Sequence, residues 1–137
     1  DWDEVMAVNV TANMRLIRTL DPLLRRSDAG RAIFVSSGVA TAPRAYWGEY
    51  ATTKAALETL ALTYAAETAS TPVRVNIVNP GRTRTAMRAA AYPGEDPATL
   101  KPPEAVVPLF VDLASPECEM TGQRVDYKDY AAKAGSS

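Results

Sequence analysis

Apolar residues recur every three or four positions along the first part of the chain. This spacing predicts a long amphipathic helix from Trp2 to about Arg26, which Pro22 is expected to kink or interrupt. A second helix is predicted from about Trp47 to Ser70, and its alanine-rich stretch favours a close contact between helices. Shorter helices are expected at 87–91 and at 103–115, where Pro103 suits a first turn and Pro108 does not suit an interior position.

Three short segments that alternate with these helices are predicted to be strands. They are Arg31–Val35, Val73–Val78 and Thr121–Asp126. Strands that alternate with helices indicate βαβ units and a parallel sheet. The first run is continuously apolar, which is typical of a strand covered on both faces. The small and polar tail, Ala131–Ser137, is expected to be frayed.

The chain begins on a helix, with no strand and glycine loop before it. Its seven glycines include no Gly-x-Gly pair, so the fingerprint of a dinucleotide-phosphate loop is missing. We therefore expect residues 1–137 to be a single partial domain, the carboxyl-terminal portion of a doubly wound parallel α/β sheet. Such a half-sheet would have an unpaired inner edge. Without a phosphate cradle, the chain alone should not bind a dinucleotide tightly.

Composition and charge exclude several classes of function. The net charge is −1, so the chain lacks the excess of basic residues that is typical of nucleic-acid-binding proteins. No apolar run approaches the ~18 residues that span a bilayer. The single cysteine, Cys118, forms no intrachain disulfide and favours a cytoplasmic location. Histidine is absent, which excludes imidazole acid–base chemistry and histidine metal ligands, and no metal site is expected. Proton chemistry must then use a carboxylate, a lysine or a tyrosine.

Distinctive polar residues follow the first two predicted strands, where ligands bind in open parallel sheets. Ser37 follows the first strand, and Asn79-Pro80-Gly81 follows the second. The helix between them opens with Tyr50 and Lys54, an i,i+4 pair on one face. An ammonium ~4 Å from the phenol would favour its ionised form by about 4 kcal/mol, or roughly three pKa units before solvent screening. A serine or a Pro-Gly after a strand is usually only a turn or cap, and a Tyr-x-x-x-Lys pair often arises by chance. The occurrence of all three together predicts a site in which tyrosine donates and accepts a proton.

Five segments, in this order along the chain, resemble landmarks of the short-chain dehydrogenase/reductase family. They are Asn9 in VMAVNVTA, Ser37 in IFVSSGVA, Tyr50-Ala-Thr-Thr-Lys54, NPGRTRT, and ASPECEMTGQRVD. The interval from Ser37 to Tyr50 is also similar to that of the family. The run from Asn79 to Val106 resembles the YciK-like branch of bacterial oxidoreductases, whose physiological substrate is unassigned.

The resemblance implies an NAD(P)-binding Rossmann-like fold and an oxidoreductase that interconverts an alcohol and a carbonyl compound with NAD or NADP. By this resemblance Tyr50 is the general acid/base, and Lys54 lowers its pKa and binds the nicotinamide ribose. Ser37 orients the substrate carbonyl, and Asn9 holds a water that relays protons. The resemblance also assigns a segment that contacts the nicotinamide, namely Pro80, Gly81, Thr83 and Thr85. It further implies a homo-oligomer, built in this family from two middle helices.

Several interpretations stay open at this point. The basic residues Arg82, Arg84 and Arg88 indicate either a solvated flap or a site for an anionic group. Tyr46 and Trp47 either line a substrate pocket or simply pack at the helix start. The last strand departs from the family pattern, because Asp126 is followed by Tyr-Lys instead of Gly-Gly. Two other hypotheses compete with the enzyme: a homologue that binds a dinucleotide or a partner without turnover, and a truncated product without activity.

Overall fold

The computed structural model describes residues 1–135. Its first helical arm consists of α1 (Trp2–Met6), a π-helical turn (Ala7–Thr11) and α2 (Ala12–Arg26). The predicted long helix is therefore confirmed, although the spacing of its apolar residues did not predict the π-helical turn. Pro22 lies inside α2, and the helix continues to Arg26, so an interruption at this proline is wrong. The missing N–H of Pro22 removes one bond near the end of the helix, where few further turns depend on it.

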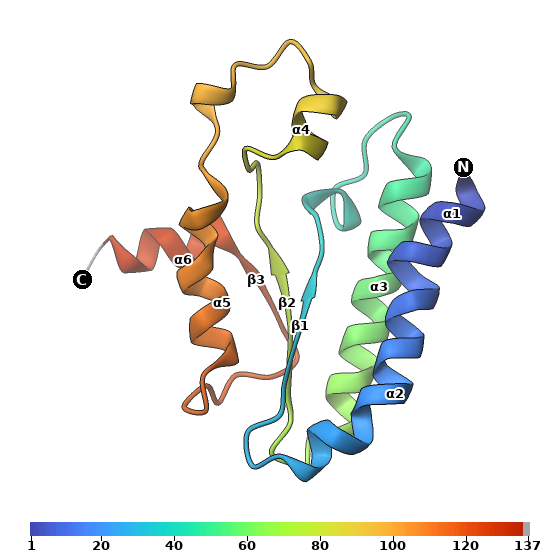
Figure 1. Ribbon diagram of the computed structural model, residues 1–137, viewed down its shortest axis with the longest axis vertical. Helices are drawn as coiled ribbons and strands as arrows, with labels where there is room; N and C mark the ends of the chain where they lie inside the picture. The colour runs from blue at the N-terminus through green and yellow to red at the C-terminus, as the bar shows by residue number, and fades with distance from the viewer. Residues whose placement is uncertain (136–137) are drawn as a thin grey trace.

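Three parallel strands form the sheet in the order β1 (Arg31–Val35), β2 (Arg74–Asn79), β3 (Gln123–Asp126). The parallel sheet is confirmed, and its strands run side by side in Figure 1. Within residues 1–135 β1 lies at one edge, as expected of a half-sheet. The expectation that β1 is covered on both faces is confirmed within the strand, because Phe34 is buried in the core beneath α3 and Ile33 packs against the core of α5; Val35, at the strand end, is 43% exposed.

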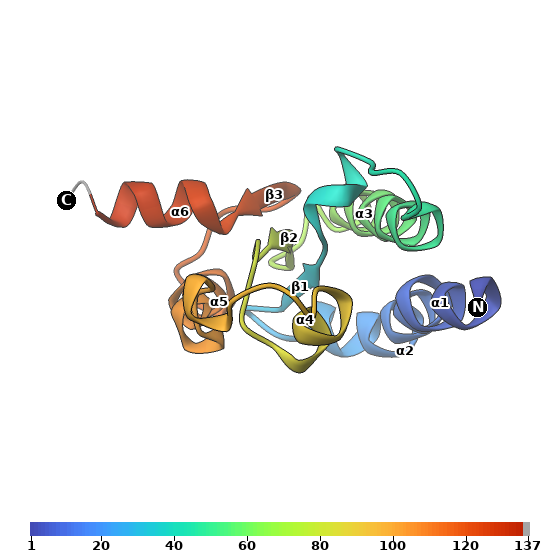
Figure 2. The ribbon, with the colours of Figure 1, turned by 90° about the horizontal axis from the view of Figure 1, so that it is seen from above.

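Helices cover opposite faces of this sheet, as Figure 2 shows from above. On one face α3 (Gly48–Glu67) packs against β2 and contacts α1, which confirms the predicted helix–helix contact. The shared core consists of Phe34, Leu57, Ala61, Tyr64, Ala65, Val73, Val75 and Ile77. On the other face α5 (Val107–Ala114) buries Leu109 and Leu113 against Val78. Apolar burial on both sides of β2 holds the strand ends in fixed positions.

The predicted helix at 103–115 is two elements. A 3-10 turn (Pro103–Val106) leads into α5, and Pro108 occupies the first turn of α5, where a missing N–H removes no internal bond. The expected short helix near 87–91 is α4 (Ala86–Ala91). Two further 3-10 turns, Gly38–Ala40 and Pro97–Thr99, lie in segments predicted as loops. No helix in the described part of the chain is long and apolar enough to span a membrane.

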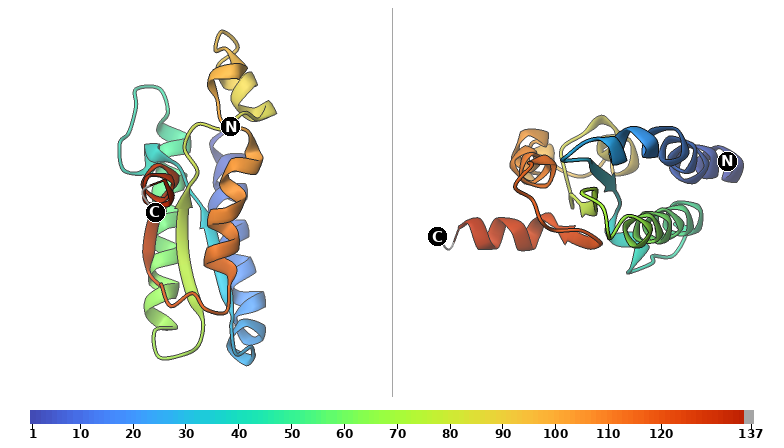
Figure 3. Two further views of the ribbon diagram at one scale, coloured as in Figure 1. Left: turned by 90° about the vertical axis from the view of Figure 1, so that its left-hand side faces the viewer. Right: turned by 90° about the horizontal axis from the view of Figure 1, so that it is seen from below.

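The expectation of a frayed tail is wrong for residues 131–134. They belong to α6 (Tyr127–Ala134), which projects from the end of β3 in Figures 1 and 3. Tyr127 and Tyr130 pack against the core of α5, and the Tyr130 hydroxyl donates to Asp112 Oδ2 at 2.6 Å. These tertiary contacts stabilise a helix that its small and polar residues do not predict. The last two residues of the predicted tail, 136–137, lie outside the described residues.

Gly30 links α2 to β1 where the two elements meet most closely. A Cβ at Gly30 would come within 2.5 Å of the Leu24 carbonyl oxygen. Backbone must shift to admit it, so we expect Gly30→Ala to lower the free energy of unfolding by about 1–3 kcal/mol. Urea unfolding of the full-length protein measures this. Gly94→Ala is the matched control, because a Cβ at Gly94 meets nothing within 4 Å; equal losses in both variants would contradict the prediction.

Candidate active site

Ser37 lies immediately beyond the carboxyl end of β1. It is the N-cap of the 3-10 turn Gly38–Ala40, and its Oγ accepts a hydrogen bond from the Val39 N–H at 3.4 Å. Its carbonyl oxygen accepts from the Ala40 N–H at 3.1 Å. The turn therefore fixes the backbone on both sides of the serine. The neighbouring Ser36 is buried and bonds Val78 through its N–H, which fastens this turn to β2.

Tyr50 and Lys54 lie in the first two turns of α3, beside Ser37. The Tyr50 hydroxyl interacts with the Ser37 side chain, so the structure brings two of the predicted catalytic residues together. Burial raises the pKa of the Tyr50 phenol above its ordinary value, and the interaction with Ser37 only partly opposes this. Burial also lowers the pKa of Lys54, while the charge of Glu58 acts in the opposite direction.

The expectation that the pKa of Tyr50 lies below its ordinary value beside Lys54 is wrong for this structure, because burial raises it. The Lys54 Nζ donates to the Val35 carbonyl oxygen at 3.0 Å and lies 5.6 Å from the centre of the Tyr50 ring. The i,i+4 spacing places the two residues on one face of the helix but does not direct the ammonium toward the phenol oxygen. Desolvation therefore dominates the pKa of Tyr50.

Asn9 reaches the same helix from the π-helical turn. Its Nδ2 donates to the Thr53 Oγ1 at 3.1 Å, and that hydroxyl donates to the Tyr50 carbonyl oxygen at 3.0 Å. Thr53 is fully buried, so this bond is shielded from water. Asn9 therefore contacts the residue next to Lys54 and supports the backbone of the turn that carries Tyr50.

The loop after β2 is held by its own hydrogen bonds. Gly81 has φ +71°, a left-handed conformation that favours glycine, and its N–H donates to the Asn79 Oδ1 at 3.1 Å. The Thr83 hydroxyl donates to the Gly81 carbonyl oxygen, and Thr85 caps α4 by accepting from the Arg88 N–H. Pro80 precedes this bend directly. The structure thus places all four residues of the predicted nicotinamide segment in one ordered loop beyond the sheet.

The residues beside Tyr50 fit a nicotinamide riboside in their chemistry. An ammonium has three N–H donors, and the Val35 carbonyl takes one from Lys54, which leaves donors for a ribose diol. The loop of Gly81, Thr83 and Thr85 offers hydroxyls and backbone groups for a carboxamide. Gly81 also lies close to a lysine, since a Cβ there would come within 3.3 Å of the Lys101 Nζ.

Aromatic rings join the start of α3 to the segment between β2 and the 3-10 turn Pro103–Val106. This segment, residues 80–102, carries α4 and is called the flap. Trp47 packs edge-on to Tyr50 and stacks on Tyr92, with centroids 5.9 Å apart in both pairs. The Arg88 guanidinium lies 3.9 Å from the centre of the Tyr92 ring and forms a bidentate pair with Glu95. This pair raises the pKa of Arg88, so Arg88 holds the flap together instead of offering an anion site. The remaining predicted residues, Arg82, Arg84 and Tyr46, are exposed.

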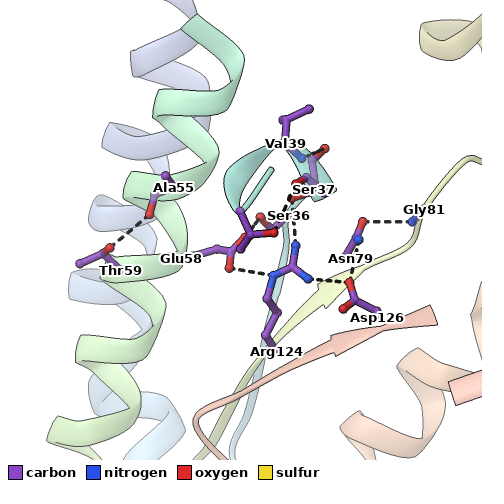
Figure 4. Close-up of polar contacts among 12 residues, drawn as sticks. Ser36, Ser37, Val39, Ala55, Glu58, Thr59, Asn79, Gly81, Arg124 and Asp126 are labelled. Atoms are coloured by element: carbon purple, nitrogen blue, oxygen red, sulfur yellow. Dashed lines mark hydrogen bonds and ion pairs between the residues drawn. The ribbon is translucent and has the colours of Figure 1, made fainter. Parts of the chain in front are cut away.

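An ion-pair network beneath Ser37 was not predicted from the sequence. Figure 4 shows the Arg124 guanidinium between two carboxylates. Its Nε donates to Glu58 Oε1 at 3.0 Å, and its Nη1 donates to Asp126 Oδ1 at 2.5 Å. The i,i+4 spacing of Lys54 and Glu58 could have indicated that Glu58 lies on the same face of the helix as the predicted catalytic lysine. No local signal indicated Arg124, because it lies 66 residues from Glu58 in the chain.

Other features of the described residues are remote from this chemistry. A surface hollow of about 530 Å³ is formed by α5, the segment after it, and residues of β3 and α6, but it includes none of Ser37, Tyr50 and Lys54. Within residues 1–135 no group of three or more Cys, Asp or Glu side chains is arranged to hold a metal ion. The candidate active site is therefore the group at the ends of β1 and β2.

Comparisons with known proteins agree with this arrangement. The family model of the short chain dehydrogenases matches residues 1–96. The uncharacterized oxidoreductase YciK of Escherichia coli K12 is 48% identical over 112 residues, which are 82% of this chain and 44% of YciK.

Two solved structures are similar along most of the chain. A short chain dehydrogenase of Salmonella enterica serovar Typhi superposes with a TM-score of 0.88 at 46% identity, covering 91% of this chain and 52% of that protein. A short chain dehydrogenase of Shigella flexneri 2a, solved with NADP, superposes with a TM-score of 0.88 at 44% identity. The match covers 93% of this chain and 53% of that protein. The chain spans about half the length of the relatives it matches. It belongs to the short-chain dehydrogenase/reductase family and resembles the YciK-like members most clearly among these relatives.

Proposed function

We propose that residues 1–137 are the catalytic, carboxyl-terminal half of an NAD(P)-dependent oxidoreductase that interconverts an alcohol and a carbonyl compound. One observation carries this proposal: the Tyr50 side chain lies beside Ser37 at the end of β1, with Lys54 one turn further along α3 and bonded to the Val35 carbonyl of the same strand. In a chain without histidine, this group supplies proton transfer at a place where parallel sheets bind ligands.

Tyr50 would act as the general acid/base. Its raised pKa keeps the phenol protonated near neutral pH, which suits a donor of a proton to the oxygen of a carbonyl substrate. The alcohol forms when this proton reaches oxygen and a hydride reaches carbon; oxidation reverses both transfers. The Ser37 hydroxyl would orient the same substrate oxygen. A bound nicotinamide dinucleotide supplies or accepts the hydride.

The cofactor would be held by the chain's own donors at this edge. Lys54 and Tyr50 would bind the ribose, while the loop of Pro80, Gly81, Thr83 and Thr85 would contact the nicotinamide. The structure of the Shigella relative with NADP supports a nicotinamide cofactor, and we propose NAD or NADP without a choice between them. Asn9, bonded to Thr53, would support a water-mediated proton path to Lys54.

We also propose a homo-oligomer in the cytoplasm. Several large apolar side chains on the first helical arm and α3 are exposed: Val8, Leu16, Leu20, Leu23 and Leu62. Contiguous exposed apolar surface favours association. A second copy packed on α2 and α3 would cover it.

Turnover by the full-length protein tests the proposed function. We expect the purified protein to oxidise NADPH or NADH in the presence of some members of a panel of ketones and aldehydes, and to form equimolar alcohol. The nicotinamide absorbance gives the rate, and chromatography gives the product. Dinucleotide binding with no turnover across the panel, in either direction of the reaction, would instead favour a non-catalytic homologue.

A further inference from the structure

We propose that Arg124 is a positioning residue of this active site, whose guanidinium fixes the backbone at Ser37 relative to the helix that carries Tyr50 and Lys54. The catalytic consequence rests on the proposed function, whereas the structural link does not. Arg124 lies in β3, within the landmark segment ASPECEMTGQRVD, in which the sequence predicts no site residue. Figure 4 shows its side chain directed toward the end of β1.

The three terminal nitrogens of Arg124 bind three different elements. Nη2 donates to the Ser37 carbonyl oxygen at 3.0 Å, Nε binds Glu58 of α3, and Nη1 binds Asp126 at the end of β3. A guanidinium is a rigid planar fork, so fixing one of these bonds constrains the directions of the other two. The Arg124 side chain is only 20% exposed, which limits screening of its ion pairs by water and salt.

Glu58 connects this fork to the catalytic helix. It lies one turn after Lys54 on α3, and its side chain is 11% exposed. One carboxylate oxygen accepts from Arg124, and the other accepts from the Ser36 hydroxyl. Because Ser36 immediately precedes Ser37, Glu58 joins α3 to the end of β1 in two ways, directly through Ser36 and indirectly through Arg124. A lysine in place of Arg124 has a single nitrogen and does not reproduce these bonds.

Asp126 extends the network to the loop after β2. Its Oδ1 accepts from Arg124 and also from the Asn79 Nδ2 at 2.7 Å. Asn79 in turn accepts from the Gly81 N–H through its own Oδ1. The chain Arg124–Asp126–Asn79–Gly81 therefore links the serine turn with the proposed nicotinamide loop. Removing the arginine would leave two neighbouring carboxylates without their shared cation, which disfavours the observed arrangement.

The kinetic test compares Arg124→Met, Arg124→Lys and Arg31→Met in the full-length protein. Arg31 is the matched control, because its guanidinium also binds several backbone carbonyls, but at the opposite end of β1. We expect Arg124→Met to lower kcat by about 10- to 100-fold, as small misplacements of catalytic groups do, with KM within about twofold of wild type. Arg124→Lys should recover only a small part of kcat. A wild-type kcat in Arg124→Met, or an equal kcat loss in Arg31→Met, would overturn the proposal.

Hydrogen–deuterium exchange tests the structural link without any turnover. The Ala40 N–H donates to the same Ser37 carbonyl that Arg124 binds. In Arg124→Met we expect faster exchange at the Ala40 amide and in the peptide covering residues 36–42, and in Arg31→Met we expect none there. Unchanged exchange in Arg124→Met would overturn the proposed fixation. If the wild-type protein reduces no carbonyl compound, the proposed reaction fails, and exchange at 36–42 still decides whether Arg124 fixes this turn.

Discussion

Tyr50→Phe should reduce turnover of an alcohol–carbonyl pair by about 10²–10⁴-fold, the usual contribution of a general acid/base. The substitution removes the hydroxyl that interacts with Ser37 and leaves the ring that packs edge-on against Trp47. The fold and the cofactor site should therefore persist, and binding of NADPH or NADH should remain near its wild-type strength. Steady-state kinetics and fluorescence titration of the dinucleotide measure the two quantities separately.

Tyr130→Phe is the matched control for this experiment. It removes a tyrosine hydroxyl that bonds Asp112 on α5, in the surface hollow that includes none of Ser37, Tyr50 and Lys54. We expect its turnover to match wild type. Near-parental turnover in Tyr50→Phe, on a substrate that the wild-type protein converts, would show that another group transfers the proton.

Lys54→Met should weaken dinucleotide binding and also move the pH dependence of the reaction. A lysine cation near the phenol favours its ionised form, so removing the cation raises the pKa of Tyr50 further above its ordinary value. Carbonyl reduction requires the protonated phenol, and its rate should then fall at a higher pH than in wild type. Because the Nζ is 5.6 Å from the ring centre and bonds Val35, we expect a smaller upward shift than an ammonium in direct contact with the phenol oxygen would give.

The pH–rate profile of kcat/KM, together with the Kd of NADPH or NADH, measures both effects. Lys128→Met is the control, since Lys128 is an exposed lysine on α6 and its loss should change neither quantity. An unchanged basic limb in an active Lys54→Met variant would mean that the lysine and the tyrosine are not electrostatically coupled. Tighter or unchanged dinucleotide binding would contradict a ribose contact.

Local sequence patterns predicted the secondary structure well wherever the buried residues recur at the regular spacing of a helix or a strand. The runs at β1 and β2 and the spacing of α2 and α3 are such cases, because one face of each element packs into the core. The helix α6 escaped prediction since it depends on Tyr127 and Tyr130 packing against α5. That contact joins segments whose proximity no local pattern encodes.

In the candidate site, too, features set by local sequence pattern were predicted and features set by tertiary contacts were not. Tyr50 and Lys54 are neighbours by helix geometry, and Ser37 joins them because the ends of parallel strands share one edge. The direction of the Lys54 ammonium depends on the Val35 carbonyl, which spacing along α3 does not reveal, so the predicted pKa direction for Tyr50 was wrong. Arg124 was missed for a similar reason, since its partners come from two other elements.

The π-helical turn at Ala7–Thr11 sets the rotational phase between the two ends of the first helical arm. Each residue of an α-helix advances the chain by about 100° around the axis, and a π-turn absorbs roughly one additional residue. If the same residues were wound as one unbroken α-helix, Trp2–Met6 would face a direction about 100° away from the one seen here relative to α2. A single-residue deletion in this turn would instead restore a continuous α-helix and leave that direction unchanged. The wider turn therefore lets the arm hold one additional residue while α1 keeps its contact with α3 and Asn9 bonds Thr53.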